Sequence, residues 1–152
     1  MIGSNKVACF VLVMSFGVTI AYSEERETVT VAEMLRVHTI VNAIADETAN
    51  LRRRMNSEET TRVFLESVIE FQKRLNPIIA SIAETDAPKE AQLYAVSLAI
   101  AVKETELAHW HYINAFLSGE QRYLNSGDVF LRESISEFAR ATSLAGGLAE
   151  VD

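Results

Sequence analysis

The sequence contains few of the residues that interrupt helices or crosslink a fold. It has one cysteine, two prolines and six glycines in 152 residues, and no glycine occurs between Glu24 and Ser118. Because glycine and proline are the strongest local breaks in regular structure, long uninterrupted helices are expected. The single cysteine, Cys9, lies in an N-terminal segment that we expect to be removed. The remaining domain would then have no disulfide, no thiolate metal site and no thioether haem attachment.

Positive charge is also scarce. The chain has 14 Lys and Arg residues against 21 Asp and Glu residues, which gives a net charge of −7. Nucleic acid and anionic membrane surfaces repel an acidic chain, so neither is expected as a partner. The one basic run, Arg52 to Arg54, falls where a helix is predicted to end. Cations there interact favourably with the helix dipole, so we interpret the run as a solvated helix end and not as an anion site.

The first 23 residues have the pattern of a secretory signal peptide. A short polar start with Lys6 precedes 15 uncharged residues, Val7 to Ala21, and the small residues Ala21 and Ser23 suit a cleavage site. We expect cleavage after Ser23, which would leave residues 24–152 as one domain and, with Lys6 lost, change the net charge from −7 to −8. An uncleaved membrane anchor is the alternative, although the apolar run is shorter than the about 20 residues that span a bilayer. Both interpretations predict export, to the bacterial periplasm or the extracellular space.

Two heptad patterns predict the first two helices, from about Val29 to Met55 and from about Glu58 to Glu84. Ser57 between them is a capping residue, so the turn is short and the second helix is expected to fold back antiparallel. The first seam comprises Met34, Val37, Val41, Ile44, Thr48, Leu51 and Met55, and the second comprises Phe64, Val68, Phe71, Leu75, Ile78 and Ile82.

Pro77 interrupts the second helix. A proline in a helix interior removes one backbone hydrogen bond and disfavours α geometry at the preceding residue, Asn76. Because the heptad pattern keeps its phase across Pro77, we predict one kinked helix. The alternative is a break, with Asn76 capping a new helix.

The third predicted helix, from about Pro88 to Leu117, is apolar on most of its sides. Such a helix is either central in its domain or shared with a partner. Ser118 and Gly119 are expected to end it, although it could continue as far as Gly127. Its apolar residues are Leu93, Val96, Leu98, Ile100, Val102, Leu107, Trp110, Ile113, Phe116 and Leu117.

The fourth helix is predicted to begin after the capping residue Asp128 and to end near Ala145. It would be shorter than the others and leave one end of the domain less covered, and residues 146–152 are expected to form a loose tail. Four helices with short connections predict an all-α fold, an up-down-up-down four-helix bundle. The third heptad seam, on this helix, comprises Leu131, Ile135, Phe138, Thr142 and Ala145.

The only dense cluster of candidate metal ligands lies in the third helix. Glu106 and His109 have the Glu-x-x-His spacing of carboxylate-bridged di-iron bundles, but those sites need two such units and two further glutamates. Because each helical residue turns by about 100°, Glu104 and His111 form a second pair on roughly the opposite side of the helix. A metal ion could therefore bind only one of the two pairs plus a ligand from another helix, such as His38. We expect partly buried structural histidines, with a divalent metal site at Glu106, His109, His111 and His38 as the alternative.

The sequence has no Gly-x-Ser-x-Gly motif, no phosphate-binding glycine loop and no His-Glu-x-x-His motif. We therefore predict a non-catalytic interaction or binding protein without a cofactor. Its partner would be another protein or a second copy of the chain, and it would contact a membrane only through an uncleaved signal segment. A metal-binding or metal-dependent protein is the alternative function. The expected interaction surface on the third helix comprises Trp110, Tyr112, Phe116 and Leu117.

Overall fold

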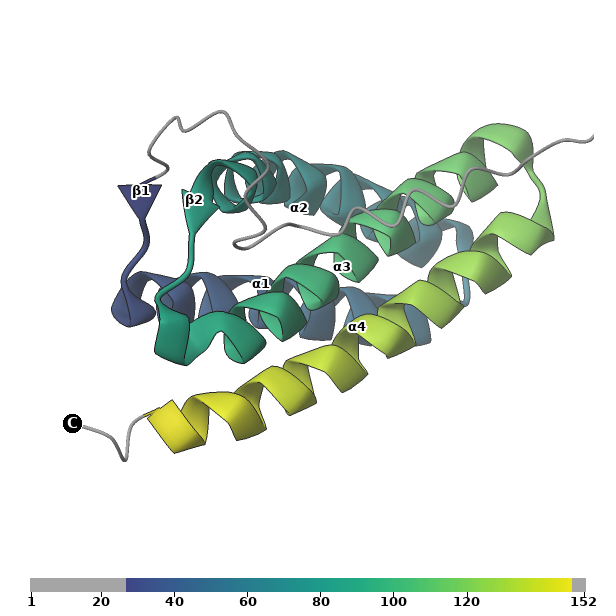
Figure 1. The fold of residues 1–152 in the computed structure, drawn as a ribbon. Coiled ribbons are helices and arrows are strands. Elements are labelled where there is room, and N and C mark those ends of the chain that lie inside the picture. The colour runs from purple at the N-terminus through teal and green to yellow at the C-terminus, as the bar shows by residue number, and fades with distance from the viewer. Residues whose placement is uncertain (1–26, 149–152) are drawn as a thin grey trace, which may run out of the picture.

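A computed structural model describes residues 27–148, and most of these residues are helical (Figure 1). The all-α prediction is therefore confirmed. The predicted signal peptide, residues 1–23, and the end of the predicted tail, residues 149–152, lie outside the described range. The four long helices are α1 (Val31–Arg54), α2 (Glu58–Glu84), α3 (Gln92–Ser118) and α4 (Gln121–Leu148).

Capping boxes begin the first two helices. The Thr30 hydroxyl accepts from the Glu33 amide at 3.2 Å, and the Glu33 carboxylate accepts from the Thr30 amide at 2.8 Å, which lowers the pKa of Glu33. Ser57 and Thr60 form the corresponding pair at the start of α2. The predicted start at Ser57 and the short turn after α1 are confirmed.

A two-residue parallel strand pair joins the start of α1 to the end of α2. Strand β1 (Glu27–Thr28) pairs with β2 (Thr85–Asp86), so these two helix ends lie together (Figure 1). Between those ends, α2 continues without a break through Pro77. The prediction of one helix across this proline is confirmed, and the alternative of two helices is wrong.

The chain turns between α3 and α4 at Gly119. This residue has φ of 71°, in the left-handed region that favours glycine, and its amide donates to the Ala115 carbonyl at 2.8 Å. The end of α3 at Ser118 is confirmed. Before α3, a short 3-10 turn, η1 (Lys89–Ala91), follows Pro88.

The predicted start of the fourth helix at Asp128 is wrong. Helix α4 begins at Gln121, so Gly127 and Asp128 lie inside it, and it extends through Gly146 and Gly147 to Leu148. It is therefore as long as the other helices, and no end of the domain is left uncovered by a short fourth helix. Gly127 is glycine because α4 passes the ring of Tyr112 there: a Cβ on Gly127 would lie 2.6 Å from Tyr112 Cε1.

Small residues bring α3 and α4 together along their length (Figure 1). The Ser134 hydroxyl donates to the Ala101 carbonyl at 3.0 Å and lies 2.7 Å from the Thr105 hydroxyl. The bond from the Ser134 side chain to the backbone of α3 requires a close approach of the two helices. The small buried residues recur every seven positions: Ala101, Ala108 and Ala115 on α3, and Gly127, Ser134 and Ala141 on α4.

Gly127 should respond to substitution in the opposite sense to a glycine in open surroundings. Gly127→Ala places a Cβ against the fully buried Tyr112 ring, so overpacking should cost about 1–3 kcal/mol, partly offset by the higher helix propensity of alanine. Gly146→Ala, whose Cβ would meet nothing within 4 Å, should gain up to about 1 kcal/mol. Urea unfolding measures both changes. Stabilisation by Gly127→Ala would contradict the close approach.

A polar network next to Gly127 connects three helices. Arg52 on α1 donates from Nε and Nη2 to the two carboxylate oxygens of Asp128 on α4, both at 2.8 Å. Tyr112 on α3 donates its hydroxyl to Asp128 Oδ1 at 2.9 Å, and burial together with the Asp128 charge raises the pKa of Tyr112. Arg52 thus forms an ion pair between α1 and α4. This corrects the expectation that Arg52 belongs to a solvated helix end.

Candidate functional site

His109 is a fully buried residue of α3 and is bonded within the core. Its Nε2 lies 2.9 Å from the Thr48 hydroxyl, whose own proton goes to the Ile44 carbonyl at 2.8 Å. Nε2 must therefore donate, which leaves Nδ1 as the unprotonated ring nitrogen. Nδ1 has no hydrogen-bond partner among the described residues, and Phe71 stacks on the ring. Burial lowers the pKa of His109 to about 4, so the imidazole is neutral near pH 7.

His38 lies in a separate polar cluster formed by α1, α3 and α4. Its Nδ1 is 3.1 Å from the Tyr94 hydroxyl, and its Nε2 is 3.3 Å from the Thr142 hydroxyl. Burial lowers the pKa of His38 and raises the pKa of Tyr94 to about 12. Both ring nitrogens of His38 therefore already have partners inside the protein.

The structure does not bring the candidate metal ligands together. Glu106 forms an ion pair with Lys103, and His111 stacks on Phe130 with ring centroids 5.0 Å apart. His109 and His38 have the separate hydroxyl partners described above. Among residues 27–148, no group of three or more His, Cys, Asp or Glu side chains is placed to hold a metal ion.

The four residues of the expected interaction surface have different surroundings. Trp110 is 47% exposed and Leu117 is 80% exposed, whereas Phe116 packs partly against Phe64. Tyr112 is fully buried and bonded to Asp128, so it belongs to the core and cannot contribute to a surface.

The outward side of α3 carries a longer apolar surface than the sequence analysis expected. Of ten large hydrophobic side chains that are exposed in the described residues, five lie on α3 and the other five are divided among α1, α2 and α4. The five on α3 share one side of the helix because they fall on positions spaced alternately by three and four residues. We call the full set the α3 stripe: Leu93, Val96, Ile100, Lys103, Leu107, Trp110, Asn114 and Leu117.

The α3 stripe is a heptad seam that no other helix among residues 27–148 covers. Six of its eight positions are apolar, and eight positions over residues 93–117 correspond to about 36 Å of helix. Trp110 and Leu117 were predicted from the sequence to belong to an interaction surface, whereas Leu93, Val96, Ile100 and Leu107 were not. The spacing that would have revealed them is present in the sequence, but the apolar residues that α3 turns toward the core hide it.

Three carboxylates lie close together beside the stripe: Glu104, which follows the stripe residue Lys103 on α3, and Glu133 and Glu137 on α4. Burial raises the pKa of Glu104, and the charges of Glu133 and Glu137 on α4 raise it further. Glu104 Oε2 and Glu137 Oε2 are buried without a hydrogen-bond partner among the described residues. We call Glu104, Glu133 and Glu137 the carboxylate trio.

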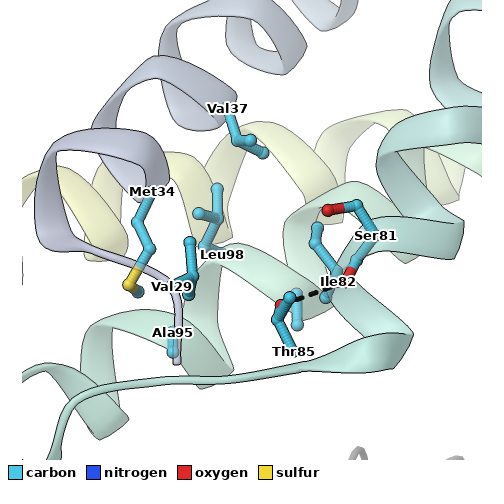
Figure 2. Close-up of a pocket in the computed structure, with 9 residues that line it drawn as sticks. Val29, Met34, Val37, Ser81, Ile82, Thr85, Ala95 and Leu98 are labelled. Carbon is cyan, nitrogen blue, oxygen red and sulfur yellow. Dashed lines mark hydrogen bonds between the residues drawn. The ribbon is translucent and has the colours of Figure 1, made fainter. Parts of the chain in front are cut away.

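A small apolar cavity lies where the start of α1, the end of α2 and the start of α3 meet (Figure 2). Figure 2 shows Val29, Met34, Ile82 and Leu98 around it. Among the residues drawn, the Thr85 hydroxyl donates a hydrogen bond to the Ser81 carbonyl at 3.0 Å. Its volume of about 40 Å³ could hold a few water molecules at most.

Comparisons with family models, curated proteins and solved structures find no match for this chain. No helix among residues 27–148 is long and apolar enough to span a bilayer.

Proposed function

We propose that this protein is an exported, non-catalytic interaction module, an up-down-up-down bundle that binds another protein through the α3 stripe. The observation that carries the proposal is that α3 has two apolar sides. One side builds the core with Tyr94, Leu98 and Val102, and the other is a heptad seam exposed to solvent. A helix in the centre of its own domain needs only the first.

The energetics favour a covered stripe. Removing one Leu or Val side chain from water is worth roughly 1.5–3 kcal/mol when burial is complete. Leu93 is 72% exposed and Leu117 is 80% exposed, so most of that free energy is unused in the isolated chain. Trp110 between them is one of the residue types enriched at binding hot spots. An amphipathic helix laid along α3, with anchors at i, i+3, i+4 and i+7, would bury all three.

The interior supports a structural role for its polar residues. His109, His38 and Tyr112 each hydrogen-bond to a side chain of another helix. Thr105 and Ser134 do the same at the α3–α4 contact. No observation among the described residues favours the alternative of a metal-dependent protein. The proposal of export rests on the signal-peptide pattern of residues 1–23.

Site-specific photo-crosslinking in the cells that produce the protein tests the proposal. A photoreactive side chain would replace Leu93 or Leu117 in the stripe, or, as controls, Leu35 on α1 or Val129 on α4, which are also exposed. Both stripe positions should give the same discrete adduct, and the controls should not. Equal crosslinking at all four positions, or none at the stripe, would contradict a specific docking surface. An adduct of twice the chain mass would identify the partner as a second copy.

A further inference from the structure

We infer that the stripe receives an amphipathic helix of another protein whose apolar side is flanked by Lys or Arg, and that these cations pair with the carboxylate trio. The inference rests on the proposed function of the α3 stripe and adds the chemistry of the partner. The apolar side of the partner helix would pack on the stripe. Charge complementarity along the rim would determine which helices bind.

The carboxylate trio has acceptor oxygens without hydrogen-bond donors among the described residues. Glu104 directly follows the stripe residue Lys103, but Lys103 pairs with Glu106 and not with Glu104. Glu137 has only Arg140, at 3.7 Å through Oε1, and no ion pair to Glu104 or Glu133 occurs among the described residues. Two of the trio's carboxylate oxygens are thus buried without a donor. A buried acceptor without a partner is costly, and a cation on a docked helix would satisfy it.

A second copy of the chain matches this surface less well. The antiparallel pairing that overlaps the whole stripe puts Leu93 opposite Leu117, with its two-fold axis at the level of Thr105. It therefore brings the two trios, six carboxylates, to the centre of the interface. The parallel pairing puts Lys103 opposite Lys103 of the other copy. Each self-pairing places like charges together, which opposes association, whereas a helix with basic flanks does not.

Three synthetic helices with the same Leu and Ile stripe test the inference. Each is about 28 residues long, lacks Trp, and has Lys, Gln or Glu at the flanking positions. The reporter is the emission of Trp110, the only tryptophan in the chain and a member of the stripe, together with calorimetric titration. The Lys-flanked helix should shift Trp110 emission to the blue and bind about tenfold tighter than the Gln-flanked helix, and the Glu-flanked helix should bind most weakly.

Two charge-matched variants locate the effect. Glu104→Gln with Glu133→Gln should weaken binding of the Lys-flanked helix about tenfold and leave the Gln-flanked helix unchanged. Glu47→Gln with Glu84→Gln removes the same charge from exposed positions on α1 and α2 and should leave Lys-flanked binding within about twofold.

The outcomes separate the inference from the proposed function. Equal binding of all three helices, or equal effects of the two double variants, would overturn the basic partner but leave the stripe as a docking surface. Concentration-dependent dimerisation with a blue shift of Trp110 in the absence of peptide would overturn the basic partner in favour of a second copy. Failure of every helix to move Trp110, together with failure of the stripe to crosslink in cells, would overturn both.

Discussion

Acidification from about pH 6.5 to about pH 4 should cost the folded domain about 3 kcal/mol through His109. Burial lowers the folded-state pKa of His109 to about 4, below the value of about 6.5 in an unfolded chain. Between these two pH values His109 is protonated in the unfolded chain but stays neutral in the folded chain. Stability is therefore complete above the unfolded pKa and falls with pH until the folded pKa is reached. His38, whose pKa burial also lowers, acts in the same direction.

His109→Leu isolates this contribution. The variant removes the titrating ring, and the Thr48 hydroxyl still donates to the Ile44 carbonyl, so no donor is left unpaired. Urea unfolding of both proteins at a series of pH values gives the free energy of unfolding. The wild-type curve should fall more steeply than the variant curve by as much as one proton, about 1.4 kcal/mol per pH unit. Parallel curves would show that His109 is not a buried neutral imidazole.

Asp128→Ala should be among the most damaging substitutions of a partly exposed residue, with a loss of about 2–4 kcal/mol. Asp128 accepts two hydrogen bonds from Arg52 and one from Tyr112. Its removal leaves the buried Tyr112 hydroxyl without an acceptor, which alone costs about 1–3 kcal/mol. The Arg52 pair adds less, because both side chains are partly exposed, 23% for Arg52 and 35% for Asp128.

A double-mutant cycle with Tyr112→Phe assigns that cost. The phenylalanine has no hydroxyl to leave unpaired, so Asp128→Ala should cost at least about 1 kcal/mol less in this background. Chemical denaturation of the wild type, both single variants and the double variant completes the cycle. Additive effects would contradict the hydrogen bond from Tyr112 to Asp128, and the loss would then come from Arg52 alone.

Local signals in the sequence were sufficient for the first two helices. The capping residue Ser57 predicted the start of α2, and the heptad pattern continues across Pro77, as does the helix. The β1–β2 pair could not be predicted in the same way, because two-residue strands carry no pattern of their own. Their pairing depends on the end of α2 returning to the start of α1.

The start of α4 was predicted wrongly because tertiary contacts, and not local signals, determine the residues found there. Gly127 was considered only as an alternative helix end, and Asp128 was predicted to be a cap. In the structure Gly127 makes room for the Tyr112 ring, and Asp128 binds Arg52 and Tyr112. The buried side of α4 is also displaced from the predicted seam, because the small residues Ser134 and Ala141 are buried and Ile135 is 37% exposed. Hydrophobicity alone does not reveal a contact made by small side chains.

The candidate site was only partly predictable, because burial decides between candidates that look alike in sequence. Trp110 and Tyr112 are both aromatic residues of α3, yet the first is exposed and the second is in the core. Once the exposed side of α3 is known, the spacing of Leu93, Val96 and Ile100 extends the stripe from Trp110 toward the start of the helix. The carboxylate trio spans two helices, so no spacing along the chain could have shown it.

Hydroxyl-radical footprinting of Trp110 tests the central claim, that the α3 stripe is a docking surface, most directly. Trp110 is 47% exposed and Val129 is 44% exposed in the isolated chain, so both should be oxidised in the purified protein. In the cells that produce it, labelling of Trp110 should fall severalfold while labelling of Val129 stays unchanged. Equal labelling of Trp110 in the purified protein and in the cell would show that the stripe stays uncovered, and the claim would be wrong.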